Sequence, residues 1–95
     1  MIYFIHDVTS RTIKIGCAWD PRRRLSTLQI STSNKLVLLG AVAGMEKVET
    51  QVHDLVCREF APKPGESYER PLRISGEWFD DRILPFVLRL IAAPK

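Results

Sequence analysis

The feature that most constrains the fold is a pair of short apolar segments, MIYFIHDV at residues 1–8 and TIKIGCA at residues 12–18, with only TSR between them. The first segment is apolar with an alternating outer part, and the second alternates between apolar and polar residues, which is typical of β-strands. The short polar interval leaves room only for a tight turn, so the two segments are predicted to form a β-hairpin. A lone hairpin is marginal in water, so we expect the rest of the chain to supply another strand and helices.

The length of the hairpin loop decides which side chains share a face of the sheet. A loop of two or four residues pairs Tyr3 with Gly16 and places Lys14 diagonally from Tyr3 on the same face. A loop of three residues reverses this parity. In the first register, the glycine leaves room above the tyrosine ring, and His6 falls on the opposite face, where we expect a structural role.

The next three segments predict a helix, a strand and a second helix. WDPRRRLSTLQ at 19–29 opens with Asp20 in the N-cap position and Pro21 at the first helical position. KLVLLGAVAG at 35–44 is a continuous apolar run of strand length, which suits a strand covered on both faces. MEKVETQVHDLVCREF at 45–60 spaces its apolar residues as an amphipathic helix does. Its expected buried face comprises Val48, Val52, Leu55, Val56 and Phe60.

The C-terminal third predicts a loop followed by a helix. APKPGESYERPLRISG at 61–76 concentrates proline, glycine and charge, so we expect a long exposed loop. EWFDDRILPFVLRLIAAPK at 77–95 predicts an apolar helix that begins near Asp80 or Asp81, with the aromatic residues before it anchored in the core. The order β-β-α-β-α-α therefore predicts one α+β domain, residues 1–95, with a three-stranded antiparallel sheet flanked by helices.

The composition excludes several classes of protein. The chain has 95 residues, of which 45% are hydrophobic and 26% charged, which is ordinary for a globular domain and unlike a disordered or membrane protein. No apolar run approaches the roughly 18 residues of a membrane span, and the N-terminus lacks the pattern of a signal peptide. We therefore expect a cytoplasmic protein in which Cys17 and Cys57 are free, partly buried thiols.

The positive charge is concentrated near the N-terminus. Residues 1–40 contain six basic and two acidic residues and therefore carry a net charge of +4. The net charge of the whole chain is +3, so the remaining residues carry −1. An anionic partner would therefore meet the N-terminal half first. Arg23 is expected to point away from the apolar side of its helix into solvent, whereas Arg22 and Arg24 flank that side.

A flanking arginine close to Tyr3 and Lys14 would form a site suited to a phosphodiester. The equally weighted alternative is that the arginines merely coat the helix. Glu49 lies four residues before His53, so both rise from one border of the second helix. Such residues are more often solvated than functional, and they would form a metal site only if the hairpin and the first helix converged on them.

Two motifs in the first half of the chain resemble those of the GIY-YIG nucleases, within the small phage and fungal branch whose second motif reads KIG. IYF at 2–4 resembles the first motif, with Met1 in place of its glycine, and KIG at 14–16 resembles the second. In that family an arginine follows the last glycine of the second motif by eight residues. The resemblance therefore selects Arg24 from the three consecutive arginines.

Two further motifs extend the resemblance. VETQVH, which contains Glu49 and His53, resembles the E-x-x-x-H helix of that branch, and GEWF at 76–79 resembles its terminal signature. The resemblance covers residues 1 to about 90. Each motif is weak alone, but their order and spacing together are fairly specific.

The resemblance implies metal-dependent hydrolysis of nucleic-acid phosphodiesters, with DNA favoured over RNA. Tyr3 would orient or activate the attacking water, Arg24 would stabilise charge on the phosphate, and Glu49 would bind one Mg²⁺ or Mn²⁺. Lys14 takes the place of the second tyrosine and would act as a general base or contact the phosphate. His53 would supply part of the proton transfer.

The remaining cations of this half, Arg22, Arg23 and Lys35, are expected to contact the nucleic acid. Because so small a chain offers little further surface, target recognition would need loops, a homodimer or a partner protein; no membrane is expected to be involved.

Two departures from the family pattern favour other hypotheses. Leu28 stands where many active members carry a histidine or tyrosine, and Cys17 stands where others carry a protonatable group. An alternative to the nuclease is therefore a binding or regulatory module that keeps the scaffold without turnover. A third hypothesis is a protein-interaction domain that uses the exposed loop at 61–75.

Overall fold

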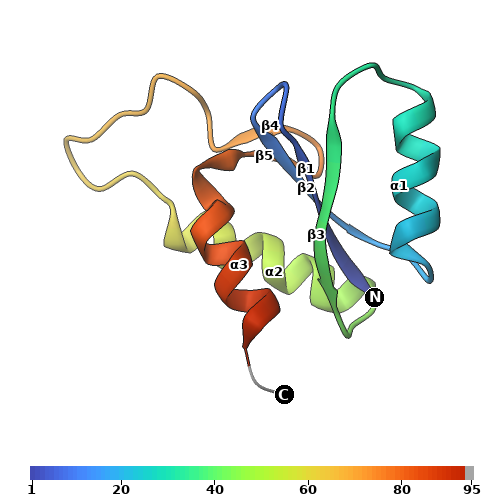
Figure 1. Ribbon diagram of the computed structural model, residues 1–95. Coiled ribbons are helices and arrows are strands. Elements are labelled where there is room, and N and C mark those ends of the chain that lie inside the picture. Colours follow the sequence, from blue (N-terminus) through green and yellow to red (C-terminus); the bar gives the residue numbers. More distant parts are fainter. Residues whose placement is uncertain (94–95) are drawn as a thin grey trace.

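The computed structural model describes residues 1–93, and its first two strands form the expected hairpin (Figure 1). β1 spans Ile2–Asp7 and β2 spans Thr12–Cys17, and they pair antiparallel. The loop between them comprises residues 8–11, and Arg11 takes a left-handed φ of 58° to close it. The loop has four residues, so it preserves the parity on which the predicted site depends.

The register of the hairpin is the one that brings the predicted site residues together. Tyr3 pairs with Gly16 and Ile5 pairs with Lys14, as predicted. Tyr3 and Lys14 therefore share a face, and His6 lies on the other. There His6 Nε2 lies 3.2 Å from a carboxylate oxygen of Asp81, which gives this histidine a structural partner.

The sheet has five strands, so the expected three-stranded sheet is too small. The strands are ordered β3-β1-β2-β5-β4, with β3 at Leu36–Val42, β4 at Arg73–Ser75 and β5 at Trp78–Asp80. β4 and β5 form a second hairpin that turns through Gly76, whose φ is 51°. Strands of three residues are too short to show alternation, and one of them lies inside a stretch whose proline and glycine content predicted a loop.

Alternation along the strands gives the sheet two faces. The core face contributes Ile2, Phe4, Ile13, Ile15 and Phe79, which pack with Val52, Val56, Ile83 and Val87. α2, at Glu46–Glu59, and α3, at Leu84–Ala92, cover this face, whereas α1, at Pro21–Ile30, lies on the opposite side beside β3 and β1 (Figure 1). Phe79 anchors the last helix in the core, as expected. Trp78 does not, because neighbouring strand residues point to opposite faces of the sheet, and its ring lies beneath the Lys14 ammonium group instead.

β3 is an edge strand, which the sequence did not indicate. Helices α1 and α3 contact it from opposite sides, as expected, but its edge is open and none of its residues is fully buried. Gly40 permits the close approach of α3, because a Cβ there would lie 2.9 Å from a methyl group of Ile91. The continuous apolar run therefore indicated contacts on two faces and not a central position in the sheet.

The helices begin where the sequence predicted, with one adjustment at the C-terminus. Asp20 caps α1 by accepting hydrogen bonds from the backbone N–H groups of Arg22 and Arg23, at 3.1 and 3.2 Å. In α2, Leu55 is exposed and not part of the buried face as expected. Asp80 caps a single 3₁₀ turn at Asp81–Ile83, and α3 follows it.

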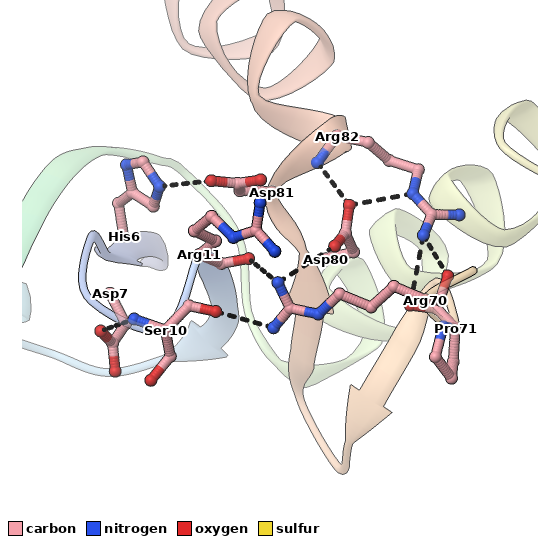
Figure 2. A network of polar contacts seen from close by, with 9 residues as sticks. All are labelled: His6, Asp7, Ser10, Arg11, Arg70, Pro71, Asp80, Asp81 and Arg82. Carbon is pink, nitrogen blue, oxygen red and sulfur yellow. Dashed lines mark hydrogen bonds and ion pairs between the residues drawn. The ribbon is translucent and has the colours of Figure 1, made fainter. Parts of the chain in front are cut away.

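A network of arginines and aspartates ties the loop at 61–72 to the first hairpin (Figure 2). Arg70 donates to the carbonyls of Ser10 and Arg11, at 2.7 and 3.1 Å, and pairs with Asp80 at 3.4 Å. Arg82 pairs with the other oxygen of Asp80 at 2.9 Å and also donates to the Arg70 carbonyl. This network holds β5 beside β2, which in turn positions the turn between β4 and β5.

None of the helices described is long and apolar enough to cross a membrane. Both cysteines are free, as expected. Cys17 is partly buried, whereas Cys57 is exposed on α2, because it lies outside the helix stripe that contacts the sheet.

Candidate functional site

A cavity of about 890 Å³ opens at the end of the sheet where β1 begins and β2 ends. Segments far apart in the sequence meet there: the start of the first strand, the turn before α1, the first turns of α1 and α2, and the turn between β4 and β5. The chemically functional side chains that line it include Tyr3, Cys17, Trp19, Arg24, Glu49 and Glu77.

Tyr3 forms the floor of the cavity. It is 1% exposed, and its ring lies directly over Gly16 on the paired strand. A Cβ at residue 16 would overlap Cζ and Oη of this ring, so the glycine is required for the close approach. Gly16 thus leaves the expected room on this face of the sheet, and the Tyr3 ring itself occupies that room.

The three consecutive arginines have different surroundings. All are exposed, but only Arg24 lines the cavity, and Arg23 lines a shallower neighbouring hollow of about 270 Å³. Arg22 lines neither hollow, and Lys35 is an exposed residue just before β3 that also lies outside both. Among residues 1–93, none of the three arginines forms an ion pair with a carboxylate.

Glu49 is not the solvated helix residue that its position in the sequence would favour. Its side chain is only 14% exposed. The pKa of Glu49 is raised to about 7, and burial is the largest cause. A hydrogen bond from Glu77 and the negative charges of Glu77 and Glu46 also raise this pKa, whereas the positive charge of Lys14 lowers it. Glu49 is therefore half protonated near neutral pH.

Glu77, with Glu46 and Glu49, is one of three carboxylates that line the cavity. Its backbone carbonyl accepts a hydrogen bond from the Ile15 N–H at 3.0 Å, which fixes the turn against β2. Burial acts to raise the pKa of Glu77, but a hydrogen bond and the positive charge of Lys14 outweigh it and leave that pKa below its usual value. Lys14 Nζ lies 3.1 Å from this carboxylate and 5.4 Å from the centre of the Trp78 ring.

His53 stands behind Glu49 and has both ring nitrogens occupied. Nε2 lies 3.0 Å from the Ile15 carbonyl, which can only accept, so Nε2 carries the proton. Nδ1 then accepts from Arg73 at 2.9 Å. The edge of the ring also contacts Phe79, and Nε2 lies 3.8 Å from Glu49. These contacts hold the imidazole ring in one orientation.

The structure thus brings together most of the residues singled out in the sequence. Tyr3, Arg24 and Glu49 line one cavity, and Lys14 and His53 adjoin it through Glu77 and Glu49. Arg22, Arg23 and Lys35 lie on the surface outside it.

The site residues predicted from the sequence did not include Glu77 or Trp19, although both line the cavity. The role of Glu77 depends on a hairpin too short to predict. Trp19 did leave a signal: it precedes the N-cap, where an apolar residue normally packs on the fourth helical residue, but here that residue is Arg24.

Of the carboxylates that line this cavity, Glu49 and Glu77 are the pair joined by a hydrogen bond, and they could hold a divalent cation. Two adjacent carboxylates match the donor set of Mg²⁺, which binds through one or two carboxylates and completes its shell with water and phosphate. Within residues 1–93 no group of three or more histidine, cysteine, aspartate or glutamate side chains is placed to hold a metal. A cation bound there would offset the negative charge of Glu77, which acts together with burial to raise the pKa of Glu49.

Comparison with known proteins supplies one match. A model of the T5orf172 domain, which occurs in phage and fungal homing-endonuclease-like proteins, matches residues 1–89. Searches among curated proteins and solved structures found no match.

Proposed function

Because the chain belongs to the T5orf172 family, we propose that it is a metal-dependent endonuclease of the GIY-YIG type that hydrolyses phosphodiester bonds, with DNA favoured over RNA. The observation that carries this proposal is the convergence of Tyr3, Arg24 and Glu49 on one cavity. These residues are far apart in the sequence. Together they suit a phosphodiester and a water molecule as reactants, with a cation as catalyst.

The side chains have distinct roles in this proposal. The Tyr3 phenol, held rigidly over Gly16, orients the attacking water. Arg24 has no internal carboxylate partner within residues 1–93, so its guanidinium is available to the phosphate and to the charge that grows in the transition state. Glu49 and Glu77 would hold one Mg²⁺ or Mn²⁺, and the ion would supply Lewis-acid polarisation of the phosphate.

Lys14 and His53 are assigned positioning roles. Lys14 pairs with Glu77 and fixes its orientation. His53 has no ring nitrogen free for proton transfer while Ile15 and Arg73 occupy both, so it supports the wall of the cavity beside Glu49. Arg22, Arg23 and Lys35 are proposed to contact phosphates outside the reaction site, and a homodimer or partner protein is proposed to extend target recognition.

The second candidate is a nucleic-acid-binding module without turnover. The observation that favours it is Cys17, which lines the cavity at a position where active members of the resembled family carry a protonatable group. In this alternative, Arg24 still binds phosphate but no bond is broken.

Cleavage of supercoiled, branched and single-stranded DNA, and of RNA, is the test. We expect cleavage with Mg²⁺ or Mn²⁺ that stops on chelation and is lost in Glu49→Gln. Glu59→Gln, an exposed carboxylate at the end of the same helix, is the matched control and should cleave normally. Metal-independent cleavage, or full activity of Glu49→Gln, would overturn the proposal. Binding without cleavage by the wild type in either metal would favour the second candidate.

A further inference from the structure

Trp19 is the largest side chain that the fold leaves in solvent. It lies between β2 and α1, immediately before the N-cap of the helix, and is 88% exposed. Tryptophan is highly buried on average, so this degree of exposure needs a cause. Within residues 1–93 the ring has no aromatic partner and no cation over its face.

The surroundings of Trp19 indicate what would cover it. It lines the cavity that holds Tyr3 and Glu49, and it also lines the shallower hollow beside Arg23, Arg24 and Thr27. Trp19 thus borders the proposed reaction site and shares the shallower hollow with two arginines, Arg23 and Arg24, that have no carboxylate partner in the described chain.

A nucleotide combines the two chemistries that this surface complements, because it carries a flat aromatic base and an anionic phosphate. Bases stack on exposed aromatic side chains, and arginines beside the platform bind the backbone. A base can do this only when it is unpaired, because in a duplex both of its faces are covered by neighbouring base pairs.

We propose that Trp19 is a stacking platform for an unpaired base next to the scissile phosphate, and that the substrate is single-stranded or carries unpaired nucleotides at the cleavage point. This inference rests on the proposed nuclease function and specifies its substrate. Arg23 holds a flanking phosphate, Arg24 keeps its role at the scissile phosphate, and the base on Trp19 sets which phosphate enters the cavity.

The test compares binding of one labelled DNA sequence as a single strand and as a duplex, in the presence of a chelator so that no cleavage occurs. Trp19→Ala should weaken single-strand binding by about 5- to 150-fold and leave duplex binding unchanged. Trp19→Phe should recover part of the loss, because it restores an aromatic face. Ile30→Ala is the matched control: Ile30 is also 88% exposed, lies at the other end of α1, and should have no effect.

A second readout uses the fluorescence of the tryptophan itself. The difference in emission between the wild type and Trp19→Phe isolates Trp19 from Trp78, and a stacked base should quench it. Unchanged single-strand binding in Trp19→Ala, or equal losses on both forms of DNA, overturns the inference. Circular dichroism of each variant separates these outcomes from misfolding.

The two proposals fail in different ways. If Glu49→Gln abolishes cleavage but Trp19→Ala cleaves and binds single strands normally, the nuclease stands and the stacking platform is wrong. If no cleavage occurs in any metal but Trp19→Ala selectively loses single-strand binding, the platform stands and the nuclease is wrong. Binding of a protein or lipid surface through Trp19, with no response to single strands, also overturns the inference.

Discussion

The cavity and the network behind the first hairpin use the same residue types in opposite ways. In the network, each charge meets its opposite: Asp80 lies between Arg70 and Arg82 (Figure 2). In the cavity, Glu49 faces another carboxylate, Glu77, and the arginines of α1 have no carboxylate partner within the described chain. A charge that the fold satisfies internally stabilises the fold, whereas a charge left uncompensated is available for a ligand.

The largest effect is expected from removing an uncompensated arginine of the cavity. Arg24→Ala should lower the cleavage rate by about 10²- to 10³-fold, because the charge that develops on the phosphate loses its donor, while the melting temperature stays the same. Arg22→Ala, on the same helix but outside both hollows, is the control and should change the rate little. Equal losses in both variants would mean that α1 supplies only general electrostatic attraction. Initial rates at saturating substrate decide between these outcomes.

The opposite behaviour is expected from the network. Asp80→Asn leaves two guanidinium groups partly buried beside a neutral amide and should destabilise the fold by about 3 kcal/mol. Asp54→Asn, at an exposed position of α2, should be neutral. Denaturant unfolding measures both. A stable Asp80→Asn protein without cleavage activity would contradict this division of roles between the network and the cavity.

A smaller effect distinguishes the carboxylates by pH. Folding raises the pKa of Glu49 from 4.5 to about 7, so the folded protein holds this proton more tightly than the unfolded chain does. The stability that protonated Glu49 contributes to the fold is therefore fully present below about pH 4.5 and is lost as the pH rises through about 7. Glu49→Gln cannot ionise, so its melting temperature should rise relative to the wild type across that window.

This measurement is made without divalent metal, because a bound cation would favour the ionised form of Glu49. The groups that face Glu49 are Glu77, Glu46, Lys14 and His53, and all four are retained in the variant. Glu59→Gln controls for loss of an acidic residue from α2. A constant difference in melting temperature between wild type and Glu49→Gln from pH 4.5 to 8 would contradict the assignment.

The smallest effect concerns the salt dependence of binding. Arg23→Ala should reduce the slope of log affinity against log salt by about 1, because one phosphate contact is lost. Arg89→Ala, on the exposed side of α3, should leave the slope unchanged. If both variants change the slope equally, Arg23 is not a preferred contact for the phosphates of the nucleic acid.

Local patterns in the sequence determined the hairpin, the start of α1 and the amphipathic face of α2. Alternation places Tyr3 and Lys14 on one face for a loop of two or four residues, and the structure supplied the four-residue loop; Asp20 with Pro21 specifies a helix start from neighbouring residues alone. The choice of Arg24 and Glu49 as site residues came from the resemblance to the GIY-YIG nucleases and not from local patterns.

Only the tertiary structure decided which of these residues meet. Whether Glu49 is solvated or buried depends on the turn that carries Glu77, and whether an arginine is open or paired depends on carboxylates distant in the chain. The two short strands β4 and β5 form only because β2 supplies an edge to pair with, so three residues alone could not indicate them. Long-range pairing and burial are properties of the assembled fold, and they decided which charges remain available for a ligand.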